Sequence, residues 1–272
     1  MKSIHHPLPL LLQTLTILFL LPSSSLASSK TLLLPSTSFN PSSTFNTYWS
    51  LNYPWGTDHN GAARMSPSQV STSSSSDGGT SSTLTLTARR VTGQKPATHG
   101  GKQIPIKYLS GAIHAKQHFT ITSPSSPSSS SSVSGYDFSA EFRAPVAKGT
   151  WPAFWLTAVN GWPPEIDMAE WKGSGKISFN TFNTSSQVMA RDVAYRSENG
   201  NDWHKVLCEV RRDGRNGGKD VEVRFWMDGK LVVTQWGRGI INLQMEGSSG
   251  SPGPEVDTLY QVRNLEVWGY GD

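Results

Sequence analysis

The sequence predicts an all-β protein built as an antiparallel β-sandwich. Short segments in which apolar and polar residues alternate recur along the chain, and turn signals rich in Gly, Ser and Pro separate them. The dipeptide Asp228-Gly229 lies between two such segments and is typical of a tight hairpin turn. No stretch shows a convincing helical period. Many short strands of this kind favour two packed antiparallel sheets.

A regular succession of strands is expected after residue 80. The clearest strand spans residues 136–143, where Tyr, Phe, Ala and Phe alternate with Asp, Ser, Glu and Arg. Further strands are predicted at residues 84–88, 111–121, 176–182, 203–212, 221–227, 231–234, 241–245 and 261–268. Residues 95–108 contain Gly and Pro and are predicted to form a loop.

Residues 46–64 interleave aromatic side chains with turn formers. This pattern favours an early strand followed by a loop over one end of a sheet. Trp55, Asp58 and His59 could reach a ligand from such a loop, but a structural role is favoured for them.

The chain begins with the features of a secretory signal at residues 1–27. Lys2 supplies the positive start, residues 8–21 form the apolar region, and Ser25-Leu26-Ala27 gives the small-residue cleavage pattern. A membrane anchor would need a longer apolar span. We therefore expect a secreted protein, in a cell-wall setting or free, with no membrane partner.

Residues 28–272 are predicted to form a single domain, since β-sandwiches often reach this size alone. Two Ser-rich tracts, residues 71–82 and 123–134, contain few apolar anchors, and strands resume directly after each. They are predicted to be flexible loop insertions.

Composition excludes some classes of function. The net charge of +4 is modest, and Lys and Arg form no long runs, so a nucleic-acid partner is not expected. Cys208 is the single cysteine and cannot form an internal disulfide. Its apolar neighbours predict a buried, inert thiol.

Three carboxylates fall within six residues at Glu165, Asp167 and Glu170. On a regular strand, residues two apart share a face, so Glu165 and Asp167 point the same way and Glu170 points to the other side. One extra residue at Met168 or Ala169, a β-bulge, would return Glu170 to the face of the other two. Such convergence is what glycoside hydrolysis requires.

Taken alone, this acidic triplet is more typical of a solvated strand, by about three to one. The aromatic segment before it, WPAFW at residues 151–155, reverses these odds, because exposed aromatics need to pack or bind something. Sugar rings present flat C–H faces that aromatic planes can cover, with a few polar groups to orient them.

These residues resemble glycoside hydrolase family 16, including its endo-β-glucanases and laminarinases. The resemblance is carried by the segment of residues 149–156, by Trp162-Pro163, and by the pattern E-x-D-x-x-E at residues 165–170. It extends more weakly from residue 136 to the C-terminus. It implies a concanavalin A-like jelly roll with a substrate cleft across its concave sheet.

The resemblance also implies roles for the acids. Glu165 matches the family's nucleophile, Glu170 its acid/base, and Asp167 the middle aspartate that supports the nucleophile. Retaining hydrolysis needs the two acting carboxyl groups about 5 to 5.5 Å apart. Crowding of like charges should raise the pKa of one neighbour and keep it protonated.

Alternation divides the aromatic side chains between two faces. If Trp151 and Trp155 face the cleft, Phe154 faces the core. Trp155 also matches the family's cleft tryptophan, and Trp162 precedes Glu165 and should border the site. We predict that these three tryptophans bind substrate, whereas Trp171 packs in the core.

Two features depart from the family pattern. Asn180 and Asn183 stand where several members carry a histidine near the catalytic centre, and Asn183 also begins a glycosylation sequon. Between the Asp228-Gly229 hairpin and the strand at residue 240, only residues 235–239 intervene, where members usually have a longer connection.

The predicted function is a secreted retaining hydrolase, acting as a monomer on internal β-linkages of a β-1,3 or mixed-linkage glucan. The alternatives are a lectin-like carbohydrate-binding protein and a transglycosylase on the same scaffold. No cofactor or catalytic metal is expected. A calcium site built from the three acids is less favoured, because Ca²⁺ usually takes six to eight oxygens from a flexible loop.

Overall fold

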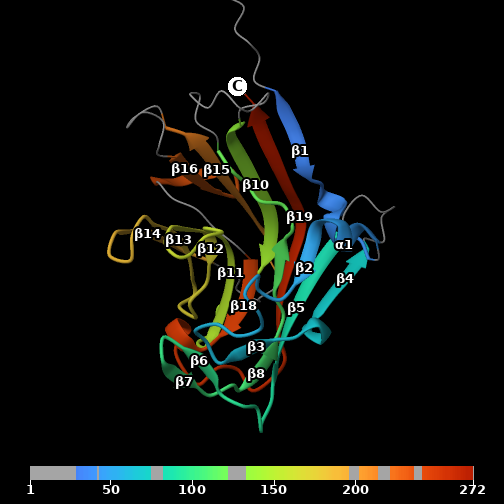
Figure 1. Cartoon of the computed structure of the whole chain (residues 1–272), viewed down its shortest axis with the longest axis vertical. Helices are drawn as coiled ribbons and strands as arrows, with labels where there is room; N and C mark the ends of the chain where they lie inside the picture. The colour runs from blue at the N-terminus through green and yellow to red at the C-terminus, as the bar shows by residue number, and fades with distance from the viewer. Residues whose placement is uncertain are drawn as a thin grey trace, which may run out of the picture.

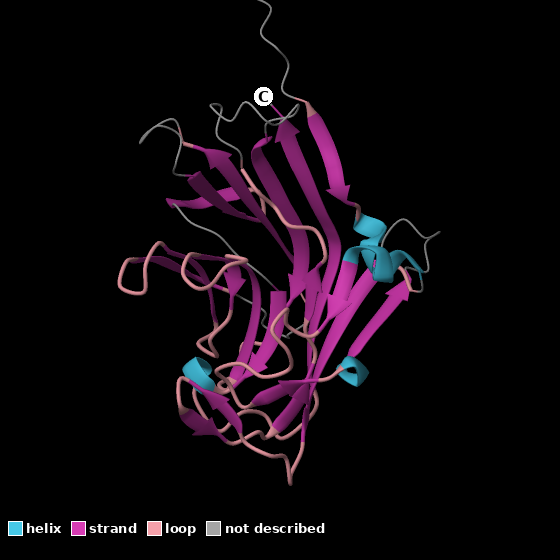
Figure 2. Cartoon of the chain, viewed as in Figure 1, coloured by secondary structure: helices cyan, strands magenta, loops and turns pink. Residues whose placement is uncertain are grey.

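Two packed β-sheets form the body of the molecule (Figure 1). The computed structural model describes residues 29–41, 43–74, 82–121, 133–195, 202–213, 221–235 and 241–271. Strands dominate this part of the chain, and its helices are short (Figure 2). The predicted all-β antiparallel sandwich is therefore confirmed.

The larger sheet contains ten strands within the described residues. They are β1 (Lys30–Leu34), β3 (Ala63–Met65), β4 (Val70–Ser74), β5 (Ser82–Arg90), β8 (Tyr108–Ser110), β10 (Val133–Arg143), β15 (His204–Arg212), β16 (Val221–Met227), β17 (Lys230–Gln235) and β19 (Thr258–Gly271). Their order is β17-β16-β15-β10-β19-β5-β8-β3, with β1 also paired to β19 and β4 to β5. Alternate apolar side chains of β5 and β10 are buried, as the predicted period-two pattern requires.

The smaller sheet has five strands within the same part of the chain. They are β11 (Thr150–Thr157), β12 (Glu165–Glu170), β13 (Lys176–Phe182), β14 (Val188–Ala194) and β18 (Ile241–Met245). The order β14-β13-β12-β11-β18 places β12, the acidic strand, at the centre. The edge strand β14 was not predicted, because its side chains are mostly exposed and show no alternation.

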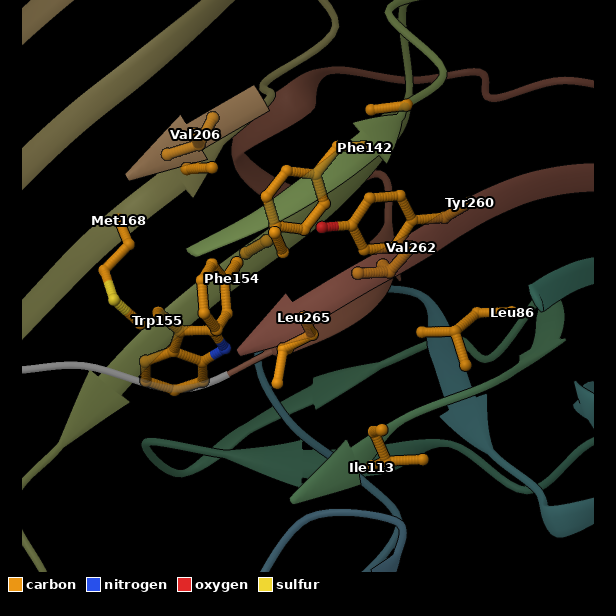
Figure 3. Close-up of a cluster of buried hydrophobic side chains, with 14 of the residues drawn as sticks. Leu86, Ile113, Phe142, Phe154, Trp155, Met168, Val206, Tyr260, Val262 and Leu265 are labelled. Carbon is orange, nitrogen blue, oxygen red and sulfur yellow. The ribbon is translucent and has the colours of Figure 1, made fainter. Parts of the chain in front are cut away.

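Aromatic side chains from the two sheets meet in the core. Phe142 of β10 lies 5.4 Å from Phe154 of β11 between ring centroids, and Phe179 of β13 lies 5.3 Å from Phe225 of β16. Figure 3 shows Phe142 and Phe154 side by side among other buried side chains. Trp171 is also fully buried here, as predicted. One face of the five-stranded sheet is therefore buried against the ten-stranded sheet.

The N-terminal part and the loops carry smaller elements. These are the helix α1 (Ser43–Tyr48), the paired strands β2 (Trp49–Leu51) and β9 (Ile113–Ala115), the hairpin of β6 (Ala97–His99) and β7 (Lys102–Ile104), and 3-10 turns at Ser36–Phe39, Pro67–Gln69 and Gly247–Ser249. The early strand is shorter than expected because residues 46–48 belong to α1. The predicted loop at residues 95–108 is partly wrong, since it contains β6 and β7. The strand predicted at residues 111–121 is limited to β9.

The described residues of the Ser-rich tracts belong to strands. Residues 71–74 pair with β5 as part of β4, and Ser82 already belongs to β5. The loop prediction was wrong there, because the backbone can extend a sheet edge without apolar side chains. Val133 and Ser134 likewise begin β10. Residues 75–81 and 122–132 lie outside the described residues, as does the predicted signal.

Two further expectations concern single positions. Cys208 is a free thiol, fully buried on β15, as predicted. In the short connection after the Asp228-Gly229 hairpin, Gln235 ends β17 and residues 236–240 lie outside the described part of the chain.

Over the ranges given above, no helix is long and apolar enough to cross a membrane.

Candidate active site

A β-bulge in β12 brings the three carboxylates to one face. Asp167 pairs with Asn180 and Glu170 with Ser178, so two residues, Met168 and Ala169, stand opposite one residue of β13. The pairing with β11 shifts at the same place. Met168 and Ala169 are both fully buried. The predicted bulge is confirmed, and we call the side that bears the three acids the carboxylate face.

The neighbouring strands show which side chains share this face. Directly opposite partners lie on the same side of a sheet, and β11 sets Ala153 against Glu170 and Trp155 against Asp167. On β18, Gln244 stands opposite Trp151. The predicted division of β11 is therefore confirmed, since Phe154 packs in the core and Trp155 lies on the carboxylate face.

Glu170 is held by three nitrogen donors. Trp151 Nε1 donates to Oε1 at 2.7 Å, and Asn180 Nδ2 donates to Oε2 at 2.9 Å. The ammonium of Lys172 lies 2.7 Å from the same Oε2. Glu170 is only 5% exposed as a residue. These donors fix the buried Glu170 carboxyl group in position.

Glu165 and Asp167 are in a different electrostatic setting. Burial and then the charge of Glu170 raise the pKa of Glu165 to about 7, although Trp162 and Lys172 act in the opposite sense. Trp162 Nε1 donates to Glu165 Oε2 at 2.9 Å. Burial, followed by the charges of Glu170 and Glu165, also raises the pKa of Asp167 well above its usual range. The expected rise in pKa from closely spaced like charges therefore occurs at Glu165 and Asp167.

An aromatic cluster adjoins the acids at the Trp155 end. His59 stacks on Trp155 with ring centroids 6.0 Å apart, and Trp55 contacts both rings. Trp155 is consequently only 6% exposed, whereas Trp55 is 48% exposed. Burial and the nearby His99 lower the pKa of His59 to about 4. His59 is therefore neutral above this pH. Trp55 provides the solvent-accessible ring of the cluster.

The loop that carries this cluster is held by a local ion pair and by long-range hydrogen bonds. Asp58 forms a two-point ion pair with Arg64, at 2.7 and 2.8 Å. Buried Gln244 accepts a hydrogen bond from the Ala63 amide at 2.9 Å and donates to its carbonyl oxygen at 3.3 Å. A Cβ atom on Gly61 would lie 2.4 Å from the Gln244 side chain. Only glycine allows this close approach of loop and strand.

Trp151 is supported from the opposite side. Gly247 has a φ of +61°, and a Cβ there would lie 2.8 Å from the Trp151 ring. Glycine adopts this conformation without strain and leaves room for the indole. The ring is thus held where its N–H meets Glu170.

The described residues contain no metal-binding cluster. Within the ranges given under Overall fold, no group of three or more His, Cys, Asp or Glu side chains is arranged to hold a metal ion. The three acids of β12 instead meet the nitrogen donors of Trp151, Trp162, Lys172 and Asn180.

Comparison with known proteins decides the family. The model of the family described as "Glycosyl hydrolases family 16" matches residues 62–207. A galactan endo-beta-1,3-galactanase of Flammulina velutipes is 46% identical over 224 residues, which cover 79% of this chain and 82% of that protein. The chain belongs to glycosyl hydrolase family 16. It is accordingly an endo-acting glycosyl hydrolase with a glycan substrate.

Solved structures of family 16 type share the fold. The endo-1,3-beta-glucanase of Streptomyces sioyaensis has a TM-score of 0.59 at 19% identity, covering 82% of this chain and 90% of that one. The laminarinase catalytic domain of Thermotoga maritima MSB8 also has a TM-score of 0.59, at 15% identity, covering 90% and 99%. The jelly-roll assignment is confirmed, while the concave cleft stays a prediction.

The structure of this family 16 chain brings most of the predicted site residues together. The three acids, Trp151 and Trp162 are in direct contact within one network. Trp155 lies beside it, but under His59 and Trp55 instead of in the open.

Sequence reasoning missed two contributors to the network. Lys172 gives no signal except its position two residues after Glu170, which on a strand continues the same face. Asn180 is marked in the sequence only as a replacement for histidine, although its distance of ten residues from Glu170 suits a neighbouring strand. Asn183, in contrast, is exposed at the turn after β13, away from the paired positions of the acids.

Proposed function

We propose that this family 16 enzyme is a secreted retaining endo-β-1,3-galactanase. The observation that carries the proposal is the convergence of Glu165 and Glu170 on one face of β12, with Asp167 between them. The Flammulina velutipes relative supports galactan as the sugar. The β-1,3 linkage agrees with the linkage expected from the sequence, whereas galactan takes the place of glucan as the favoured chain.

The proposed reaction has two steps. In the first, the ionised form of Glu165, which predominates above its raised pKa of about 7, attacks the anomeric carbon and forms a glycosyl–enzyme ester. Glu170 meanwhile gives its proton to the departing glycosidic oxygen. In the second, Glu170 takes a proton from water, the water oxygen bonds to the anomeric carbon, and Glu165 leaves. Two inversions give net retention of configuration.

The other groups have supporting roles in this mechanism. Asp167 and Trp162 contact Glu165 and hold it for attack. Trp151 and Asn180 orient Glu170. The exposed ring of Trp55 is proposed to cover a sugar face next to the acids, with Trp155 and His59 behind it. The C–H face of a sugar ring would approach neutral aromatic surface there.

A transglycosylase would use the same intermediate, with a sugar hydroxyl in the place of water. The test is product analysis on β-1,3-galactan, β-1,3-glucan and mixed-linkage β-glucan, with and without an added galactobiose acceptor. We expect shorter galacto-oligosaccharides with retained anomeric configuration, measured by proton NMR during the reaction. Inverted products would exclude the double displacement. Faster cleavage of a glucan than of galactan would exclude the galactanase assignment.

Secretion is a separate part of the proposal, and residues 1–27 support it by their charged start, apolar region and small-residue cleavage pattern. Expression of the full chain in a eukaryotic secretory host tests it. The expected mature protein appears in the medium and begins at Ser28. Retention of the protein in the cell with Met1 intact would refute it.

A further inference from the structure

Lys172 occupies an unusual place for a lysine, next to the group that must act as an acid. It directly follows Trp171, whose side chain is fully buried in the core, so alternation turns Lys172 back to the carboxylate face. Its Nζ lies 2.7 Å from Oε2 of Glu170, and its side chain is 35% exposed. The contact therefore lies at the edge of the site and is partly shielded from water.

The donors around Glu170 determine where its proton can reside. A carboxylate offers about four lone-pair positions, two on each oxygen. Lys172 and Asn180 both approach Oε2, and Trp151 takes one position on Oε1. The position left for a proton is the second one on Oε1. An ammonium group can only donate, so Lys172 favours the ionised form of Glu170.

Other charges around Glu170 act in the opposite sense. Glu165 and Asp167 come from the same strand and repel a negative charge on Glu170. Burial would lower the pKa of Lys172, but the nearby carboxylates, Glu170 foremost, raise it above its ordinary value. Lys172 therefore faces the carboxyl groups of Glu165, Asp167 and the acid/base together.

The remaining neighbours are neutral or engaged elsewhere. From β11 and β13, Glu170 meets the neutral side chains of Trp151 and Asn180. Ser178, its partner across β13, donates to Asp192 of β14 at 2.7 Å. Beyond Trp151, Glu246 is paired with Lys107 at 2.7 Å.

We propose that Lys172 is a positioning residue that holds Glu170 as a carboxylate and thereby sets the alkaline limit of activity. This inference rests on the proposed role of Glu170 as acid/base. Before the first step, Lys172 disfavours the protonated form of Glu170. In the second step, it stabilises the Glu170 carboxylate that acts as the base. Its removal should let Glu170 keep its proton to higher pH.

The variants for the test are Lys172→Met, which keeps length without charge, and Lys172→Arg, which keeps charge. Lys176→Met removes an exposed lysine at the start of β13 and is the matched control. The first measurement uses full-length protein with carbon-13 in the glutamate carboxyl groups, and Glu170→Gln assigns the Glu170 signal. In Lys172→Met the Glu170 titration should move to higher pH by about one unit or more. Lys172→Arg and Lys176→Met should leave it in place.

The second measurement is the pH dependence of kcat/KM. For β-1,3-galactan, the alkaline limb of Lys172→Met should move to higher pH by the same amount. A dinitrophenyl glycoside of galactobiose has a leaving group that needs no proton. For this substrate, the alkaline limb of Lys172→Met should stay at the wild-type pH. A structural role alone would lower activity without moving one limb selectively.

The two measurements separate two failures. An unmoved Glu170 titration in a folded Lys172→Met protein overturns the role of Lys172, whether or not the enzyme acts on galactan. If the titration moves as expected but no β-1,3-glycan is cleaved, the electrostatic role stands and the proposed function is wrong. A limb that shifts equally on both substrates also overturns the inference, because Glu170 would not be the titrating acid.

Discussion

A single amide nitrogen of Asn180 connects two carboxyl groups of the site. Its Nδ2 atom donates to Asp167 Oδ2 at 2.8 Å and to Glu170 Oε2 at 2.9 Å. All three side chains are at most 5% exposed as residues. The two hydrogen atoms of one NH₂ group therefore hold in place two groups whose charges repel each other.

Replacement of Asn180 by Ala should destabilise the protein. Asp167 and Glu170 would lose a shared donor without gaining access to water, which costs about 1 to 3 kcal/mol of unfolding free energy. Urea denaturation at neutral pH measures this loss. Asn183→Ala, at an exposed position on the following turn, is the control and should change stability little. Equal effects of the two variants would show that the bridge contributes nothing.

Glu165→Gln should abolish turnover while binding persists, because the shape is kept and the nucleophile is lost. Calorimetric titration with a galacto-oligosaccharide should give an affinity near that of the wild type. Hydrolysis within tenfold of the wild-type rate would remove Glu165 from the role of nucleophile.

The same substitution should have a pH-dependent effect on stability. The pKa of Glu165 is raised from 4.5 to about 7 in the fold, so the native state holds a proton that the unfolded chain releases. The associated stability is complete below about pH 4.5 and is lost as the pH rises through about 7. Glutamine needs no proton. At pH 8, Glu165→Gln should therefore be more stable than the wild type by about 1 to 3 kcal/mol.

Thermal unfolding at pH 4 and pH 8 checks this expectation. The difference between variant and wild type should be small at pH 4, where both side chains are neutral. Glu255→Gln removes a carboxylate that is paired with Arg90 on the surface and should show no such pH dependence. If Glu165→Gln stabilises the protein equally at both pH values, the native state does not hold the extra proton on Glu165.

Glu170→Ala tests the acid/base role. This variant should lose activity on galactan, whose leaving group needs a proton, but it should still form the ester from an activated aryl glycoside. Azide should then restore the second step, since it attacks without a general base. The measurement is the rate of aryl release with added azide and the detection of a β-glycosyl azide. Absence of that product, in a folded variant, would assign the acid/base elsewhere.

Trp55→Ala tests the exposed aromatic surface. Loss of this ring should raise KM about fivefold, equivalent to roughly 1 kcal/mol, with little change in kcat, because the ring contacts bound sugar away from the reacting bond. Trp226→Ala is the control, since Trp226 lies on the ten-stranded sheet and donates to Glu209. A fall in kcat at constant KM would instead place Trp55 at the reacting sugar.

Local rules predicted the features of the site that depend on neighbours in sequence. The bulge followed from the spacing of Glu165, Asp167 and Glu170, and the buried positions of Phe154 and Trp171 followed from alternation. The cover over Trp155 could not be predicted in this way. It depends on Gln244, which contacts Ala63 across 181 residues of chain. No local pattern specifies which loop a buried glutamine will hold.

The strands of the two sheets show the same distinction. The strand at residues 136–143 is recognisable because burial on one face leaves an alternating pattern. β4 and β14 were missed because sheet edges are set by backbone pairing, and their side chains remain largely exposed. Edge strands therefore carry little of the pattern from which central strands are recognised.

The bulge in β12 determines where this strand tolerates a change of length. Loss of Met168 would restore ordinary pairing with β13 and leave Glu165, Asp167 and Glu170 on their shared face. Loss of Ile166 instead would turn Glu165 into the core. Insertions and deletions that preserve the chemistry can thus accumulate at one position of the strand. Related enzymes could differ there by one residue and keep the same three acids in register.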